Sequence, residues 1–517
     1  MASSRPLQTA AAGLNSALSA ITNEGDRLNQ KNTISRTIEQ LTSLLEDESL
    51  SVSDAEIESA AAAVAKTISP VLVGLDSRPR TNDNDDDDDT SQTPETYRHI
   101  VQRGTEFSKA AIRCLDLLAQ RSISAVAAAD QVLLTLTAFA DESEPWIPSV
   151  EVSTQASNLL DRLLGDAPAK EQFMAESVLQ RYLRPLFSKS KPEAITSSGR
   201  KAAFVDPFRG RGEGLPDDSA ETKPWKFTDL RAIPAVAWVI READELFITK
   251  HWPLFIPVLL TLVDDQSTGV RRQGLLVLKC FLEKYPSKTL HGTGLAQVFE
   301  DAIFPTLNFL PSLTPEDESV QLLGPAFEAL LCLARKQASP TTGPTTKEPR
   351  PNSTLLDKVL REGVFSAYFH CKDHPRIVTV LCQQTISIAN QLGIHTVKHL
   401  KDLIPMLSTI LSNPFGPAAP ATLLAAIKAL QAVLQTCWPR IPTSPWQDEI
   451  INALSLCWLA ACDQATRPGT ILSELSATGA MLAAVLRTQG VELADVVAPL
   501  VQKEPLLAAL FASSPSS

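Results

Sequence analysis

Residues 251–323 decide the fold class of this chain and read HWPLFIPVLLTLVDDQSTGVRRQGLLVLKCFLEKYPSKTLHGTGLAQVFEDAIFPTLNFLPSLTPEDESVQLL. Their apolar residues recur at the three- and four-residue spacing of amphipathic helices, and short polar stretches separate these groups. The stretch therefore predicts two antiparallel helices, a turn and a further helix pair.

The composition of the whole chain also favours helices. Glycine (21 residues) and aromatic side chains (6%) are sparse, while hydrophobic residues make up 44% of the chain, an ordinary globular proportion. The 36 prolines lie mostly at the edges of apolar segments, which indicates many joints between helices. With 517 residues, we expect two to four domains or one elongated repeat array.

Polar turn centres recur along the second half of the chain. They lie near Asp264, Pro315, Asp373, Pro414 and Ala465, so that successive positions differ by 51, 58, 41 and 50 residues. These intervals are close to the roughly 40 to 47 residues of HEAT and armadillo units, with insertions. A single helix pair cannot bury its apolar face alone, whereas stacked pairs share a continuous core. The sequence predicts an all-α fold, an α-solenoid of HEAT-like helical hairpin repeats.

Changes in composition predict the domain organisation. One stretch is rich in acidic residues and another in Ser, Lys, Gly, Pro and Asp, and neither offers an apolar face to bury. The acidic stretch is interpreted as a disordered loop, with an acidic tether or phosphorylated site as the alternative. The predicted parts are an N-terminal helical region (1–188) with the acidic loop (76–96), a flexible linker (189–225), and the solenoid (226–517) with a loop insertion (338–352).

Charge and cysteine usage restrict the partners. Of the net charge of −12, Asp83 and Asp85 to Asp89 supply six, leaving −12 + 6 = −6 for the rest. No basic stripe favours nucleic acid, no uninterrupted apolar run approaches the ~18 residues of a membrane span, and no apolar signal core opens the chain. The eight cysteines form no CxxC pair and predict buried free thiols in a reducing compartment. We expect no direct nucleic-acid or membrane partner.

Motifs of enzymes are absent from the sequence. It contains no P-loop, no GxSxG elbow and no HExxH pair, so we predict no catalytic residues and no cofactor. His370, Cys371 and His374 form the only metal-like cluster, but Pro375 follows directly and no second cysteine pair completes a zinc site. We predict structural or surface histidines and no metal, with a metal site as the minor alternative.

Several residues of the opening stretch resemble the HEAT consensus in order and spacing. The resemblance implies that the aspartate caps the turn, the valine enters the core, and the arginine reaches acidic groups in neighbouring repeats. A tryptophan at the start of an apolar helix is interpreted as packing, with a partner-binding anchor as the alternative. The residues predicted to serve repeat packing are Trp252, Pro257, Asp264, Asp265, Val270 and Arg271.

Two segments are TGL-x-x-VFEDA, which begins at Thr293, and LPSLTPE, which begins at Leu310. A turn between helices does not require such a fixed order of residues. Together with His251-Trp252-Pro253, LLTLVDD (259–265) and residues 269–278, the two segments resemble the Tti-two family, the second Tel-two-interacting protein of the Triple T complex. Because helix packing does not explain the sequence of the TGL-x-x-VFEDA and LPSLTPE segments, these two segments are the candidate partner-binding surface. The candidate residues are Thr293, Gly294, Leu295, Phe299, Leu310, Pro311, Thr314, Pro315 and Glu316.

The resemblance implies a non-enzymatic scaffold, a co-chaperone adaptor that joins Tti-one and Tel-two homologues. With the heat-shock-protein-ninety system, such a complex supports the maturation and stability of phosphatidylinositol-3-kinase-related kinases. It thereby affects target-of-rapamycin signalling, the DNA-damage response and telomere maintenance, in cytoplasm and nucleus. The alternative is another HEAT-repeat adaptor, such as an importin-type transport receptor, although those arrays are usually longer and acidic on the concave face.

Overall fold

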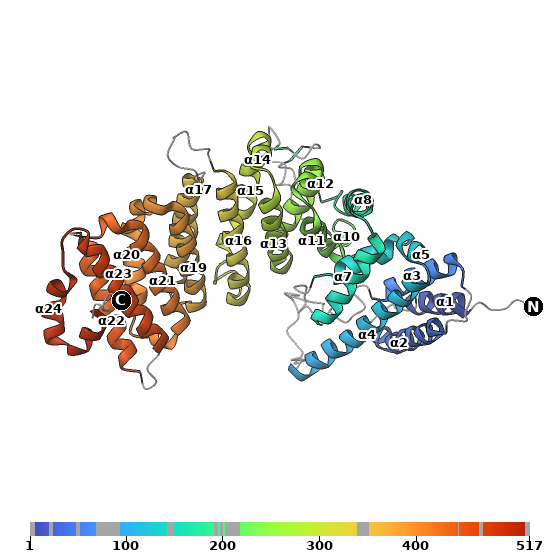
Figure 1. Cartoon of the computed structure of the whole chain (residues 1–517), viewed down its shortest axis with the longest axis horizontal. Helices are drawn as coiled ribbons and strands as arrows, with labels where there is room; N and C mark the ends of the chain where they lie inside the picture. The colour runs from blue at the N-terminus through green and yellow to red at the C-terminus, as the bar shows by residue number, and fades with distance from the viewer. Residues whose placement is uncertain are drawn as a thin grey trace, which may run out of the picture. The chain divides into compact units, whose positions relative to one another are not determined.

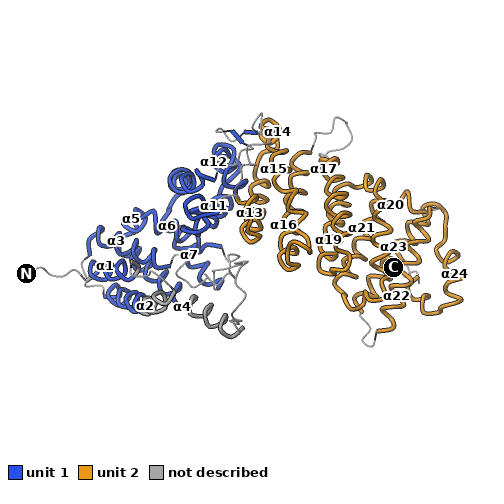
Figure 2. The backbone as a smooth tube through the Cα atoms, turned by 180° about the vertical axis from the view of Figure 1, so that it is seen from behind, with its two compact units in different colours: residues 1–261 blue, residues 262–517 orange. Residues whose placement is uncertain are grey.

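The structure is a computed structural model, and it describes residues 6–19, 24–47, 52–68, 94–141, 149–190, 195–196, 200–201, 218–338, 351–442, 444–464 and 469–511. Within these ranges the regular structure is helical, apart from an isolated bridge between Ile195 and Lys201. The predicted all-α class is confirmed. The chain divides into two compact units, residues 1–261 and 262–517 (Figure 2).

The first unit is built of short and medium helices. In it, α3 packs on α1, α4, α5 and α6, while α4 also packs on α2 and α7, and α11 on α6 and η1. Its elements are α1 (Pro6–Ser19), α2 (Glu24–Glu46), α3 (Asp54–Thr67), α4 (Pro94–Arg121), α5 (Ile123–Ala128), α6 (Asp130–Phe139), α7 (Val150–Leu164), α8 (Ala167–Gln172), the π-helix η1 (Phe173–Leu183), α9 (Arg184–Leu186), α10 (Pro224–Phe227) and α11 (Ala232–Glu242), with α12 (Glu245–Val263) crossing the division.

The division of the structure differs from the predicted linker at 189–225. The described end of that stretch is tied into the first unit: Trp225 is fully buried and stacks on Phe187, with ring centroids 5.0 Å apart. The Thr261 hydroxyl also donates to the Ser190 carbonyl at 2.9 Å. Trp225, at the end of the predicted flexible linker, therefore packs into the first unit, while residues 191–194, 197–199 and 202–217 of that linker lie outside the described residues. Of the acidic stretch 76–96, residues 76–93 lie outside the described residues, and Pro94 opens α4.

A half-buried ion pair holds α6 and the start of α11 together in the first unit. The Arg231 guanidinium donates to both carboxylate oxygens of Asp229, at 2.8 and 2.7 Å, and to the side-chain oxygens of Gln131 and Thr135 at 2.9 and 3.0 Å. Burial alone lowers the pKa of Arg231, but the hydrogen bonds and charge of Asp229 more than offset it and raise that pKa. Burial also raises the pKa of Tyr182, whose ring lies 5.9 Å from the guanidinium.

The second unit is a row of helical hairpins, as predicted. Each hairpin runs from a first helix, often interrupted by a 3₁₀ or π segment, into a straight second helix. Its elements are α13 (Thr268–Lys284), α14 (Ser287–Thr293), α15 (Leu295–Ile303), η2 (Phe304–Asn308), α16 (Glu316–Lys336), α17 (Ser353–Lys358), η3 (Val359–Phe365), α18 (Ser366–Cys371), α19 (Pro375–Leu392), η4 (Gly393–His399), α20 (Leu400–Leu411), η5 (Gly416–Ala418), α21 (Pro420–Cys437), η6 (Trp438–Arg440), α22 (Pro445–Cys462), α23 (Gly469–Arg487), α24 (Leu493–Lys503), η7 (Pro505–Leu507) and α25 (Ala508–Phe511).

The second helices of successive hairpins form a continuous ladder. The chain of contacts runs α13 to α16 to α19 to α21 to α23, so each hairpin buries its apolar face against its neighbours (Figure 1). The turns within the hairpins lie at 264–267, 309–315, 372–374, 412–419 and from 463 onward. The predicted turn centres are confirmed where these residues are described. All of these turns lie on the lower side of the unit in Figure 1.

Gly274 sets how closely α13 approaches the end of the preceding helix. A Cβ atom at this position would meet the Leu262 backbone carbon at 2.7 Å and the Val263 nitrogen at 2.9 Å. We expect Gly274→Ala to destabilise the second unit by about 1–3 kcal/mol, because backbone atoms cannot move aside as a flexible side chain can. Hydrogen exchange of α13 measures the effect.

Gly269→Ala is the matched control for this prediction. It lies in the same helix, and the nearest atom to its added Cβ is the Ser267 Oγ at 3.9 Å. The control should be neutral or slightly stabilising, because alanine favours helix over glycine. Equal protection of α13 in the two variants would contradict the close approach at Gly274.

Hydropathy in the second half of the chain reflects helix packing. By length and mean hydropathy alone, four helical segments among the described residues could cross a membrane, unlike the prediction from uninterrupted apolar runs. Between 44% and 61% of each such window is buried in the structure, and α19, α21 and α23 fill the ladder. About half of each apolar window is therefore buried between neighbouring helices. The four segments are Glu245–Val263, Pro375–Leu411, Pro420–Arg440 and Gly469–Arg487.

Candidate protein interface

The turn between α12 and α13 has the predicted packing geometry. The Asp265 side chain is buried, and its Oδ1 accepts a hydrogen bond from the Ser267 backbone N–H at 2.9 Å, which closes the turn. Its neighbour Asp264 is exposed. Val270 is only 1% exposed, in the helix that packs on α16. The structure places Asp265 and Val270 as repeat packing requires.

Arg271 joins this turn to the next hairpin. Its Nε donates to the Asp265 backbone carbonyl at 3.1 Å and its Nη1 to the Thr306 hydroxyl at 3.2 Å, while the guanidinium lies 4.6 Å from the centre of the Phe309 ring. Burial lowers the pKa of Arg271, and the charges of Asp264 and Asp265 oppose that lowering. The resemblance implies acidic groups in a neighbouring repeat, whereas the described contacts of Arg271 with the next hairpin are a hydroxyl and an aromatic face.

The other residues of the repeat pattern are less buried. Trp252 and Pro257 are half-buried in α12, and the Pro257 carbonyl accepts a hydrogen bond from the Thr261 hydroxyl at 2.7 Å. In the following helix, α13, Leu276 is 36% exposed. Its neighbours Leu275 and Leu278 are fully buried instead, because the core face of α13 turns away from position 276.

Two predicted partner-binding residues belong to the core. Leu295 and Phe299 are fully buried in α15, so the TGL-x-x-VFEDA segment does not present them to a partner. Gly294 has a φ of +70° where α14 meets α15, a conformation that favours glycine, and the Thr293 hydroxyl donates to the Thr289 carbonyl of its own helix. The sequence of this segment therefore fits a tight joint between α14 and α15.

The LPSLTPE segment forms an exposed turn. Residues 309–315 link η2 to α16, and Ser312 has a φ of +109°. Leu313 is 91% exposed, because the turn carries its side chain away from the core. The predicted residues of this segment differ in exposure: Leu310, Pro311, Thr314 and Glu316 are half-buried, and Pro315 is exposed.

Three large apolar side chains lie exposed at successive hairpin turns. Leu313 is followed by Phe369, 76% exposed and three residues before the 372–374 turn, and by Phe415, 82% exposed in the 412–419 turn. We call these three residues with their turns the turn edge. Aromatic side chains are enriched at protein interfaces, so the turn edge is the candidate interaction surface of this unit.

Polar contacts between neighbouring hairpins hold the turn edge together. The Thr268 hydroxyl donates to Glu318 at 2.7 Å, linking the first turn to the start of α16. From there, His374 Nδ1 lies 3.3 Å from Glu316, and Arg376 pairs with Asp317. These contacts fix the spacing of successive turns, so the exposed apolar side chains sit on a pre-organised platform.

Sequence reasoning missed Phe369 and Phe415. The only local signal was an apolar residue beside turn formers: Phe415 follows Asn413-Pro414, and Phe369 precedes the Lys372-Asp373 turn. An aromatic residue in such a place is equally compatible with a buried anchor. Its exposure depends on the path of the neighbouring helices.

The residues of the metal-like cluster have separate environments. His370 is exposed and lies edge-on to Phe369, Cys371 is buried, and His374 contacts Glu316. Over the parts of the chain that the structure describes, no group of three or more His, Cys, Asp or Glu residues could hold a metal ion.

All eight cysteines are free, and six of them are buried, which confirms the prediction for those six. Burial raises the pKa of the Cys382 and Cys457 thiols to about 12, so both stay protonated near neutral pH. The buried cysteines are Cys114, Cys332, Cys371, Cys382, Cys437 and Cys457.

A ladder of stacked HEAT-like hairpins defines a helical-repeat protein of the α-solenoid class. A family model described as the Tti2 family matches residues 132–418, more than half of the 517 residues. The chain belongs to the Tti2 family. The match includes the 251–323 stretch whose wording carries the resemblance, and it spans parts of both units.

Two mammalian relatives share part of this sequence. TELO2-interacting protein 2 of Homo sapiens is 26% identical over 214 residues, 40% of this chain and 38% of that protein. TELO2-interacting protein 2 of Mus musculus is 24% identical over 213 residues, with the same shares. The chain thus covers well under half the length of these relatives.

Solved structures with a similar arrangement of helices are larger transport receptors. The karyopherin Kap121p bound to the extreme C-terminus of the phosphatase Cdc14p gives a TM-score of 0.42 at 12% identity, covering 99% of this chain and 48% of that chain. Importin beta gives 0.32 at 13%, covering 97% and 76%. The assignment of the fold rests on this chain's own helices.

Proposed function

We propose that this chain is a non-enzymatic scaffold subunit of the complex of Tel-two, Tti-one and Tti-two. In this role it acts with the heat-shock-protein-ninety chaperone system in the maturation and stability of phosphatidylinositol-3-kinase-related kinases. The proposed partners are Tti-one and Tel-two homologues, and the proposed location is cytoplasm and nucleus. Signalling by target of rapamycin, the DNA-damage response and telomere maintenance are affected through the client kinases.

The observation that carries this proposal is membership of the Tti2 family over residues 132–418, with relatives named for their interaction with TELO2. The turn edge supports it physically. Leu313, Phe369 and Phe415 offer apolar area that a partner would remove from water, and the ion pairs around them supply a polar rim.

Affinity purification of the full chain tests the proposed partners. A tagged copy expressed in its own cells should recover Tti-one and Tel-two homologues in stoichiometric amounts. Depletion of the chain should lower the amounts of the large kinases without lowering their transcripts. A clean purification that lacks both homologues would exclude the proposal.

The turn edge makes a specific prediction for this complex. Replacing Leu313, Phe369 and Phe415 together by Asp is expected to weaken recovery of the partner pair by at least about a hundredfold. The reason is that exposed apolar anchors contribute about 2 kcal/mol or more each at interfaces, and the new charges would have to be desolvated. Quantitative mass spectrometry of the purified complex measures this loss.

A matched variant separates the turn edge from general surface effects. Ile394, Leu456 and Leu506 are 52%, 43% and 48% exposed and lie in η4, α22 and η7, away from the hairpin turns. Replacing these three by Asp adds the same charge and should leave recovery unchanged. If the two triple variants bind alike, the partner pair uses another surface.

A further inference from the structure

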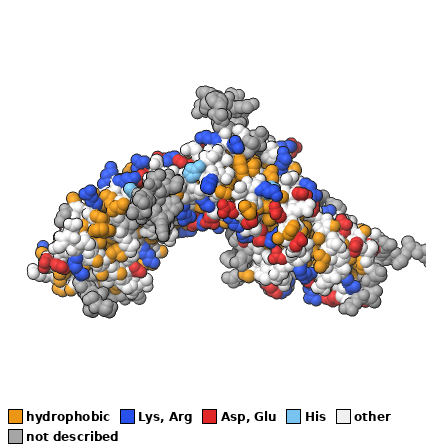
Figure 3. Space-filling view, turned by 45° about the horizontal axis from the view of Figure 1, so that its top comes forward, with side chains coloured by type: hydrophobic (Ala, Val, Ile, Leu, Met, Phe, Trp, Pro, Cys, Tyr) orange, Lys and Arg blue, Asp and Glu red, His pale blue; other side chains and the backbone are white. Residues whose placement is uncertain are grey.

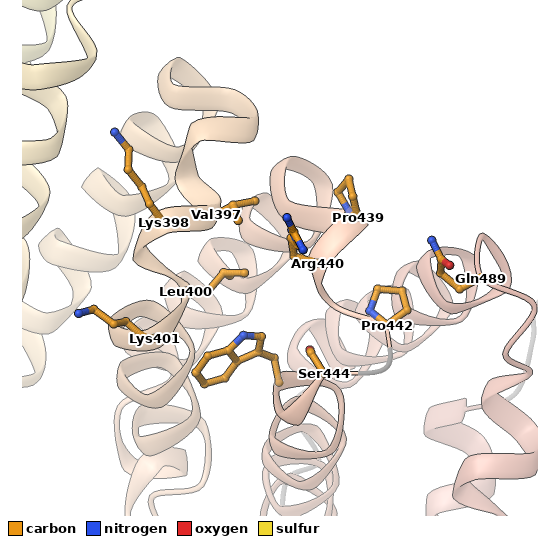
Figure 4. Close-up of a pocket in the computed structure, with 10 residues that line it drawn as sticks. Val397, Lys398, Leu400, Lys401, Pro439, Arg440, Pro442, Ser444 and Gln489 are labelled. Atoms are coloured by element: carbon orange, nitrogen blue, oxygen red, sulfur yellow. The ribbon is translucent and has the colours of Figure 1, made fainter.

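A recess opens on the second unit between the segments that connect its last hairpins. It has a volume of about 500 Å³, a size that suits a side chain or short peptide segment. It lies where η4 meets α20, beside η6 and the start of α22 (Figure 4). The lining residues are Val397, Lys398, Leu400, Lys401, Pro439, Arg440, Pro442, Ser444, Trp446 and Gln489.

The charged residues that line this recess are all basic. Lys398, Lys401 and Arg440 line it, and none of its described lining residues is acidic. Lys398 is already paired with Asp357, which also accepts a hydrogen bond from His399 Nε2 at 2.8 Å. Lys401 and Arg440, both exposed, have no ion-pair partner within the described part of the chain. In Figure 4 Arg440 lies between Val397 and Pro439, and the Lys401 side chain extends outward, away from Arg440.

Part of the remaining lining is apolar. Trp446 and Val397 are half-buried and Pro439 is exposed, so these three side chains present apolar surface to the recess, while Leu400 and Pro442 lie buried beneath it. Figure 3 shows Lys and Arg side chains interspersed with exposed hydrophobic ones at this C-terminal end of the chain. A free inorganic anion would pair with the two cations and leave the apolar lining in contact with water. A ligand that carries both carboxylates and an apolar side chain would contact the cations and the apolar lining together.

We propose that this recess binds a short acidic segment of another protein that carries an aromatic side chain. The aromatic group packs on the accessible part of Trp446, and flanking carboxylates pair with Lys401 and Arg440, the latter through two parallel hydrogen bonds. The chain's net charge of −12 opposes long polyanions such as nucleic acid, so recognition is confined to this local basic rim. The inference does not depend on the proposed complex.

Three labelled peptides test the ligand chemistry by fluorescence anisotropy with the purified full chain. The first carries Asp and Glu on both sides of one Phe, the second replaces the acids by Asn and Gln, and the third replaces the Phe by Ser. The first should bind at least about tenfold more tightly than either of the others. Equal binding of the first and second, or displacement of the first by inorganic phosphate at constant ionic strength, would overturn the proposal.

Charge reversal tests the location. Lys401→Glu with Arg440→Glu should weaken binding of the first peptide at least about tenfold and abolish its salt dependence. Arg272→Glu with Lys372→Glu changes the net charge equally at two exposed residues outside the recess, and should leave the affinity unchanged. All four side chains are exposed, so unchanged thermal unfolding is expected in both variants. Equal losses in the two variants would show non-specific attraction and refute the site.

Discussion

Val270→Asp is expected to abolish the folding of the second unit. Val270 is 1% exposed in α13, beside the ladder contact with α16, so the new carboxylate would have no access to water. Burying an unpaired charge costs several kcal/mol, a large part of the roughly 5–15 kcal/mol that stabilises a domain. We expect loss of soluble protein, or a second unit that is open to limited proteolysis while the first stays resistant.

The control for this prediction lies two residues along the same helix. Arg272 is exposed, so Arg272→Asp introduces the same carboxylate into water and should leave the second unit folded. Hydrogen exchange across α13 and α16 compares the two variants. If Val270→Asp keeps native protection in both helices, Val270 does not lie in the core of this repeat.

Arg231→Met is expected to destabilise the first unit by about 3–5 kcal/mol. The substitution leaves the carboxylate of Asp229, whose side chain is 18% exposed, without the guanidinium that donates to both of its oxygens. It also removes the hydrogen bonds from α11 to Gln131 and Thr135 of α6. Thermal unfolding with hydrogen exchange of α6 and α11 measures the loss.

A second substitution distinguishes an unpaired charge from lost packing. Adding Asp229→Asn to Arg231→Met removes the buried charge and should restore a large share of the stability. Arg162→Met breaks the pair with Asp116 at 2.7 Å, whose side chains are 46% and 36% exposed, and should cost under about 1 kcal/mol. Equal effects of the two arginine variants would contradict the role of burial.

Features encoded in a few neighbouring residues were predictable from the sequence. Asp265 closes a turn with Ser267 two residues later, and Val270 falls on the apolar face of its own helix, so local spacing suffices for both. The hairpin turns were predictable for the same reason, because prolines and acidic residues interrupt the apolar period.

Features that depend on contacts between residues distant in the sequence were not predictable from the sequence alone. The specific wording around Leu295 and Phe299 suggested a surface, but it encodes a tight joint that buries both side chains. Phe415 is 82% exposed in a turn whose η5 segment packs on α21 and α22, so its exposure depends on contacts that its own neighbours in the sequence do not encode. Trp225 stacks on Phe187. A single stacking contact of this kind cannot be predicted from the composition of the polar stretch that precedes Trp225.

The cross-links between successive hairpin turns have a mechanical consequence. Thr268–Glu318, Glu316–His374 and Asp317–Arg376 each join one hairpin only to the next, as the ladder of second helices does on a larger scale. A bending force on the second unit is therefore shared as small rotations over many weak joints in series, and no single hinge absorbs it. Such a unit is expected to bend elastically, and its bending stiffness can be changed by substitutions at individual surface contacts.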